Sequence, residues 1–149
     1  MDTIRFEKTL VWVDTGDIKK RVVGKIIINE KPLIDTIRVY EQPFAIEENH
    51  ESLAGGYMYR CASRLYKELT GQNPSKENSL GIPILICGSC CMFGCWELFV
   101  HIDETASEVI WFNFYNFARS GRWDYSRFPI YRFDKIQYAI ALEELREKN

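Results

Sequence analysis

The sequence lacks several features by which enzymes are commonly recognised. It has only two histidines, His50 and His101, in 149 residues, and it contains neither a glycine-rich phosphate loop nor a Gly-x-Ser-x-Gly elbow. Cys95, Glu97 and His101 are the residue types of a nucleophile, an orienting group and a base. Along a straight strand, however, Cys95 and His101 would be too far apart for direct contact. We therefore expect no catalytic residues, and an enzyme acting on a small substrate is kept only as an alternative.

Long hydrophobic runs and a strong excess of one charge are also missing. No apolar run approaches the roughly 18 residues of a membrane span, and the first residues do not have the pattern of a signal peptide. We therefore expect a cytoplasmic protein without a membrane partner, whose five cysteines are reduced thiols or metal ligands. The net charge of −2 supplies no positive field, which argues against nucleic acid as a partner.

The composition is typical of one well-packed globular domain. Apolar residues make up 46% of the chain, charged residues 27% and aromatic residues 14%. A chain of this length buries enough surface to fold without disulfides, and aromatic side chains contribute large buried areas. We therefore predict a single domain that spans residues 1–149.

Alternating and β-branched patterns predict several strands, and apolar spacings of three and four residues predict helices between and after them. We expect strands over residues 3–13, 21–29, 81–87, 95–102 and 108–115. The order of these elements has no strict strand–helix–strand rhythm. The fold class that follows is α+β, an antiparallel sheet of about five to six strands with two or three helices packed on one face.

Three segments have helical periodicity. The first runs from Pro32 to just before Pro43, which is expected to end it, although residues 34–40 also fit a strand. The second runs from Met58 to Leu69, with Cys61 on its apolar face and Gly71 in a position typical of helix ends.

The third helix has the clearest start signal. Asp134 can cap it, with Gln137 at the third helical position, and Phe133 can pack on Tyr138. The apolar stripe of this helix is expected to consist of Ile136, Ala139, Ile140, Leu142 and Leu145.

Four cysteines lie within nine residues, between Cys87 and Cys95. If strands 81–87 and 95–102 pair as a hairpin, Cys87 and Cys95 face each other at its neck and Cys90 lies in the loop. These three thiols are candidate zinc ligands, although the sequence has no second Cys-x-x-Cys pair. A redox pair formed by Cys87 and Cys90 is another interpretation. Buried structural thiols are a third.

Ten aromatic residues and four arginines lie between Trp111 and Phe133. Trp111 and Phe133 fit core positions of strands. The Trp123-Asp124-Tyr125 segment lies in an expected loop, where large aromatic side chains need a partner surface. The candidate binding surface consists of Arg119, Arg122, Trp123, Tyr125 and Arg127, which are residue types favoured at protein interfaces.

The runs CCMFGCWEL (90–98), VIWFNF (109–114), WDY (123–125) and FDKIQY (133–138) resemble a group of small uncharacterised bacterial proteins. The resemblance covers most of the chain and implies a bacterial source, but no activity and no catalytic residues. The pattern of the group has glycine at the position of Cys91, which leaves Cys90 and Cys95 as the more interesting pair.

Taken together, the sequence predicts a non-enzymatic protein-interaction domain whose partner is another protein. A zinc-stabilised binding domain that uses the 87–95 loop is one alternative. A toxin-immunity protein is another, because the chain is small and acidic and shows no active-site pattern.

Overall fold

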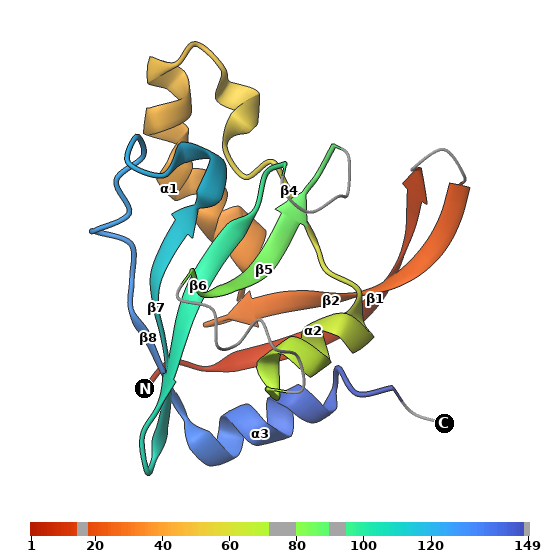
Figure 1. The fold of residues 1–149 in the computed structure, drawn as a ribbon. Helices are drawn as coiled ribbons and strands as arrows, with labels where there is room; N and C mark the ends of the chain where they lie inside the picture. Colours follow the sequence, from red (N-terminus) through yellow and green to blue (C-terminus); the bar gives the residue numbers. More distant parts are fainter. Residues whose placement is uncertain (15–17, 72–79, 90–94, 148–149) are drawn as a thin grey trace.

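The computed structural model describes residues 1–14, 18–71, 80–89 and 95–147, which form two antiparallel sheets and three α-helices (Figure 1). The predicted α+β class is confirmed. The first hairpin forms a sheet of its own, so the described strands divide between two sheets. Among the described residues, none of the helices has the length and apolar character that a membrane crossing requires.

The elements follow one another along the chain in a mixed order. The smaller sheet consists of β1 (Ile4–Asp14), β2 (Ile18–Ile28) and β3 (Lys31–Pro32), in that order. The larger sheet consists of β4 (Tyr57–Tyr59), β5 (Ile82–Cys87), β6 (Leu98–Glu104), β7 (Glu108–Asn116) and β8 (Tyr131–Asp134), also in chain order. The α-helices are α1 (Leu33–Glu47), α2 (Ala62–Leu69) and α3 (Lys135–Glu143), and short 3-10 turns lie at Glu51–Leu53 and Phe117–Arg119.

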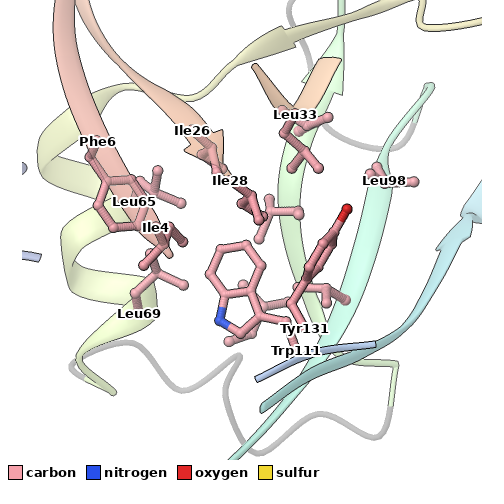
Figure 2. Packing of buried hydrophobic residues seen from close by; sticks show 14 of the residues in the cluster. Ile4, Phe6, Ile26, Ile28, Leu33, Leu65, Leu69, Leu98, Trp111 and Tyr131 are labelled. Atoms are coloured by element: carbon pink, nitrogen blue, oxygen red, sulfur yellow. The ribbon is translucent and has the colours of Figure 1, made fainter. Parts of the chain in front are cut away.

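The hydrophobic core lies between the inner half of the β1–β2 hairpin and the larger sheet. Ile4, Phe6, Ile26 and Ile28 point from the hairpin toward Trp111 of β7 (Figure 2). Helix α2 and the residues that follow α3 cover the core beside the hairpin. Leu65 of α2 and Leu145, just after α3, are fully buried there. Burial of so many large apolar side chains is the main stabilising contribution to the fold.

The predicted core positions of Trp111 and Phe133 are confirmed, since both side chains are fully buried. The two rings meet edge to face with centroids 5.8 Å apart. Trp111 also donates a hydrogen bond from Nε1 to the Tyr138 hydroxyl, at 3.1 Å. The indole therefore brings its one polar atom into the core with a partner, as buried tryptophans normally do.

Helix α1 is longer than its sequence predicts, because it continues through Pro43 to Glu47. The prediction that Pro43 ends this helix was wrong. The residues after Pro43 pack against the loop that joins β7 and β8, where Ala45 is buried against Trp123. A helical proline releases the carbonyl four residues earlier. Here that carbonyl belongs to Val39, on the exposed side of the helix, where water can hydrate it.

The second predicted helix contains a strand and a helix. Met58 belongs to β4, where it pairs with Ile86, and α2 begins only after Cys61, which is its N-cap. Residues 57–59 form a strand because the fully buried strand β5 pairs with them, and this distant partner cannot be inferred from the local sequence pattern. Cys61 is consequently half-buried at the helix start. Gly71 follows α2 with a φ of 76°, the left-handed conformation expected of a residue that ends a helix.

Helix α3 begins as predicted but presents a different face to the core. Asp134 accepts a hydrogen bond from the Gln137 N–H at 3.0 Å, and Phe133 stacks on Tyr138 at 5.8 Å. The expected core stripe through Ile136 and Ile140 was wrong, since these side chains are 73% and 66% exposed. The aromatic contacts of Tyr138 turn that face inward instead, together with Ala141 and Leu145.

Candidate functional site

The loop between β7 and β8, residues 117–130, carries all five residues of the predicted binding surface. Arg122 and Arg127 are exposed, Arg119 and Tyr125 are half-buried, and Trp123 is buried. Arg119, Arg122, Trp123 and Tyr125 attach the loop to glutamates at α1, and Arg122 does so while it stays exposed. We refer to this segment as the 117–130 loop.

The first attachment point is Glu48, at the C-cap of α1. Its carboxylate accepts hydrogen bonds from Trp123 Nε1 at 2.6 Å, Arg122 Nη2 at 2.8 Å and Arg119 Nε at 3.1 Å. Partial burial acts to raise the pKa of Glu48, but the hydrogen bonds from Trp123 and Arg119 and the charges of both arginines outweigh it, so the pKa lies below its ordinary value. The ionised carboxylate thus holds the loop to the helix end.

Aromatic rings surround this ion pair. The Arg119 guanidinium lies 4.9 Å from the ring centroid of Trp96 and 5.8 Å from that of Trp123. The two indoles meet edge to face at 5.7 Å, and Phe44 of α1 stacks on Trp123 at 6.2 Å. Cation–π contacts of this kind stabilise a guanidinium while its charge remains paired with a carboxylate.

The second attachment point is Glu41, two helical turns before Glu48 and fully buried. Its carboxylate accepts hydrogen bonds from the Gly55 N–H at 2.9 Å, from the Tyr57 hydroxyl at 2.6 Å and from the Tyr125 hydroxyl. Burial raises the pKa of Glu41 above its ordinary value, although the three donors act in the opposite direction. Burial and the adjacent Glu41 also raise the pKa values of Tyr57 and Tyr125.

Asn116, the fully buried last residue of β7, connects the two attachment points. Its side-chain amide donates to the Tyr57 hydroxyl at 2.8 Å, and its side-chain oxygen accepts from the Arg119 N–H at 3.2 Å. A single network therefore links α1, β4, β7 and the 117–130 loop. Its polar atoms satisfy one another in the interior, which makes the loop position well defined.

A groove of about 940 Å³ lies between the second half of β7 and the 117–130 loop. Its lining is mainly aromatic and includes Phe112, Phe114, Tyr115, Trp123, Tyr125 and Phe128. Phe114 packs into the core, whereas Tyr115 stacks on Phe99 on the opposite face of the sheet at 5.5 Å. Because side chains from both faces of β7 line it, the groove follows the edge of this strand.

A β-bulge shapes this edge. The β6–β7 register shifts between Phe99 and His101, and Asn113 has a φ of 56°. The Asn113 side-chain amide lies 3.1 Å from His101 Nδ1. On the other side of β7, the described ladder with β8 covers only residues 108–111. The edge of β7 from Phe112 onward is thus not covered by a paired strand among the described residues.

Two of the three candidate zinc ligands, Cys87 and Cys95, lie in the described part of the chain. Cys87 is buried in β5 opposite Tyr57, and Cys95 is exposed. The paired part of the β5–β6 hairpin ends at Leu85 and Leu98. Cys90 lies outside the described residues. Within the residues described, no group of three or more Cys, His, Asp and Glu side chains is placed to hold a metal ion. The zinc site therefore stays a prediction.

Sequence reasoning missed the two glutamates that position the loop. Glu41 falls on the same helical face as Ile34, Ile37 and Ala45, and all four are buried. A glutamate in an apolar stripe is a signal that could have revealed its role. The sequence contains no comparable signal for Glu48, whose partners lie more than 70 residues away.

Comparisons of the chain with protein-family models, with curated proteins and with solved structures found no match. The chemical role of the site is therefore inferred from its geometry alone. The carboxyl of Glu41 is enclosed and already accepts three hydrogen bonds, and that of Glu48 is held by three donors. Both act as anchors, and the groove that they shape offers a strand edge and aromatic rings for binding.

Proposed function

We propose that the protein is a non-enzymatic protein-interaction domain that binds an extended segment of a partner protein in the groove beside β7. The observation that carries this proposal is the edge of β7 after Trp111, where pairing with β8 ends and the groove begins. Addition of a strand to an open sheet edge is a common mode of peptide recognition, because main-chain hydrogen bonds supply affinity independent of sequence.

The lining of the groove indicates the chemistry of the segment. Side chains of an extended peptide alternate between two sides. One side would contact Phe112 and Tyr115 of β7, and the other would contact Tyr125 and Phe128 of the loop. We therefore expect apolar side chains at alternate positions. The Arg122 side chain is 61% exposed at the loop wall, so an acidic side chain at one end of the segment would lie near a cation.

Rigid walls support binding because little ordering is needed when the partner arrives. The 117–130 loop is held to α1 by Glu41 and Glu48 and to β7 by Asn116. Tyr40 of α1 adds a further contact, since its hydroxyl donates to the Asp124 carbonyl at 2.6 Å. The loop wall of the groove is thus preformed.

Selection from a phage-displayed library of random linear peptides tests this function. Selected peptides are expected to bind the wild-type protein and to lose at least about tenfold in affinity toward an Ile130→Ser, Phe112→Ala double variant, because both residues line the groove. Val39→Ser is the matched control, since Val39 is an exposed apolar residue on the outer side of α1. Circular dichroism and thermal melting establish that each variant is folded.

N-methylation of alternate backbone nitrogens in the best peptide tests the strand-addition mode. Methylation on the edge that faces β7 is expected to abolish binding, whereas methylation of the intervening nitrogens leaves it largely intact. Peptides that bind the double variant as tightly as the wild type would refute the groove as the binding site. Equal tolerance of both methylation patterns would refute strand addition.

A further inference from the structure

The outer part of the β1–β2 hairpin extends away from the larger sheet and the helices, as Figure 1 shows at the right of the molecule. We call this part, residues 8–14 and 18–22, the arm. Leu10 is paired with Val22, and Trp12 is paired with Lys20. Because side chains alternate along a strand, these residues lie on the same face as Phe6 and Ile26, which are buried in the core.

The apolar face of the hairpin therefore continues from the core into solvent. Leu10, Trp12 and Ile18 are 58%, 67% and 69% exposed, and Val22 is 44% exposed. Single exposed apolar residues are normal, but a contiguous group on one face indicates an interaction surface.

Helix α3 covers this face only as far as the start of the arm. Leu145, just after α3, is fully buried and lies against Gly24. Lys8 donates from Nζ to the Arg146 carbonyl at 2.6 Å. Beyond these contacts Leu10, Trp12 and Ile18 stay exposed, so a helix packed on this face by another molecule would continue an arrangement that the chain already uses.

A second unpartnered apolar surface lies on the outer side of α3. Ile136 and Ile140 are 73% and 66% exposed, one helical turn apart. Together with Ala139 they line a shallow groove of about 670 Å³ between α3 and the β6–β7 turn. This surface, which we call the outer stripe, is opposite the face of Tyr138 and Ala141 that packs on the core.

The charges around the two surfaces are opposite in sign. On its apolar face the arm presents Lys8, which is paired with Gly24, and Lys20, which is paired with Trp12. The end of α3 and the residues that follow it contain Glu143, Glu144 and Glu147 against Arg146, all of them exposed. Two arms laid face to face would bring like charges together. An arm laid on an outer stripe brings cations to carboxylates, and such complementarity selects the partner.

We propose that two copies of the chain associate by exchanging arms, so that the apolar face of each arm lies on the outer stripe of α3 in the other copy. A pair of identical reciprocal contacts is the arrangement of a two-fold dimer, the commonest oligomer of soluble proteins. This inference concerns surfaces distinct from the groove beside β7 and does not depend on the proposed peptide-binding function.

Sedimentation equilibrium of the wild-type protein between about 1 and 100 µM tests the association, since interfaces of ordinary size dissociate in or below this range. We expect a reversible dimer. An arm variant, Leu10→Ser with Trp12→Ser, and a helix variant, Ile136→Ser with Ile140→Ser, are each expected to weaken dimerisation at least about 30-fold, the loss typical of central interface residues. Val39→Ser is the control with an exposed apolar residue elsewhere, and it should dimerise like the wild type.

Mixing the two variants identifies the occupant of each surface. The arm variant retains an intact outer stripe and the helix variant retains an intact arm, so the mixture should form a heterodimer with one of the two contacts.

Charge reversal provides a second test of which surface the arm contacts. Lys20→Glu should weaken dimerisation, and combination with Glu143→Lys in the same chain should restore it, because Glu143 lines the groove beside the outer stripe.

Three results would overturn the proposal. A wild-type protein that stays monomeric to about 100 µM would show that another molecule, or none, covers the arm. Dimerisation that is lost in the arm variant but unchanged in the folded helix variant would indicate arm-to-arm contact. Dimerisation that neither variant affects would place the interface elsewhere. Circular dichroism of each variant separates loss of association from loss of fold. The charge-reversal variants alter only exposed residues, so they still test the interface if an apolar variant fails to fold.

Discussion

Glu41 and Glu48 lie two turns apart on α1, and each accepts a hydrogen bond from an aromatic residue of the 117–130 loop, Tyr125 and Trp123 respectively. Their pKa values move in opposite directions. Glu41 is enclosed among neutral donors, so burial dominates and raises its pKa, whereas Glu48 meets two guanidinium groups, which lower its pKa despite partial burial. One helix thus holds the same loop through two carboxylates of different character.

Replacement of Glu41 is expected to lower the free energy of unfolding substantially. Glu41→Ala removes the acceptor of three hydrogen bonds and leaves the buried Gly55 N–H and Tyr57 hydroxyl without it, for an expected loss of about 3 kcal/mol. Urea denaturation measures this loss. The neighbouring exposed Gln42→Ala is the control, with an expected change below about 0.5 kcal/mol. Equal losses in the two variants would contradict the anchoring role.

The raised pKa of Glu41 predicts a specific pH dependence of stability. Between the pKa of the unfolded chain, near 4.5, and the higher pKa of the folded protein, the native state binds more protons than the unfolded state. The contribution of this group is therefore fully present below pH about 4.5 and is lost as the pH rises through the folded pKa.

Urea denaturation of the wild type and of Glu41→Gln at several pH values between about 4 and 8 measures this dependence, since the amide does not titrate in that range. The stability of the wild type relative to the variant should decrease as the pH rises. A relative stability that increases over this range would mean that the folded protein lowers the pKa of Glu41.

Arg119 and Arg122 form a matched pair, because both bind Glu48 but only Arg119 is enclosed. The Arg119 side chain is 20% exposed and lies over two indole rings, whereas that of Arg122 is 61% exposed. Arg119→Ala should destabilise the protein by about 1 to 2 kcal/mol, because it removes cation–π contacts as well as the ion pair. Arg122→Ala should change stability by less than about 1 kcal/mol, and high salt should reduce its effect further.

Thermal melting of both variants at low and high salt provides the measurement. Two equal effects, or a larger effect for Arg122, would show that the charge of Glu48 matters more than the packing of Arg119 between Trp96 and Trp123.

Gly81 and Gly121 both have positive φ angles, 95° and 78°, but differ in surroundings. A Cβ atom at Gly81 would lie 2.6 Å from the Val100 carbonyl oxygen, whereas a Cβ at Gly121 would meet no atom within 4 Å. Gly121→Ala should therefore lose about 1 kcal/mol from backbone strain alone. Gly81→Ala should lose clearly more, because β5 must also move away from β6. Chemical denaturation of the two variants checks this order, and comparable losses would contradict it.

The parts of the fold that the sequence predicts correctly depend on local signals. Asp134 caps α3 through a contact three residues away, and Gly71 ends α2 through its own backbone conformation. The continuous apolar run of β5 is likewise visible in the sequence. Such signals act within a few residues, so no knowledge of the tertiary structure is needed to interpret them.

Predictions failed where distant residues decide the outcome. Met58 pairs with Ile86 in a strand although its spacing fits a helix. The inner face of α3 is selected by the contact of Tyr138 with Trp111, which lies in β7, 27 residues earlier in the chain. Local periodicity fits both faces of α3 almost equally well, and only the partners distinguish them.

The candidate site was predictable in part. The sequence correctly places Trp123 and Tyr125 in a loop and anticipates that they need a partner surface. That surface belongs to α1, and its glutamates are about 80 residues away along the chain. The groove itself depends on where the β7–β8 ladder stops, which is a property of the folded sheet.

The exposed position of Trp12 has a practical consequence for experiments. Trp111 and Trp123 are enclosed and Trp96 is half-buried, whereas the Trp12 ring is 67% exposed with Lys20 above it. A dissolved quencher that collides with indole rings will reach Trp12 far more readily than the other three. The fluorescence of this one residue can therefore be followed separately in the unmodified protein, as a built-in signal of whether the end of the hairpin is covered.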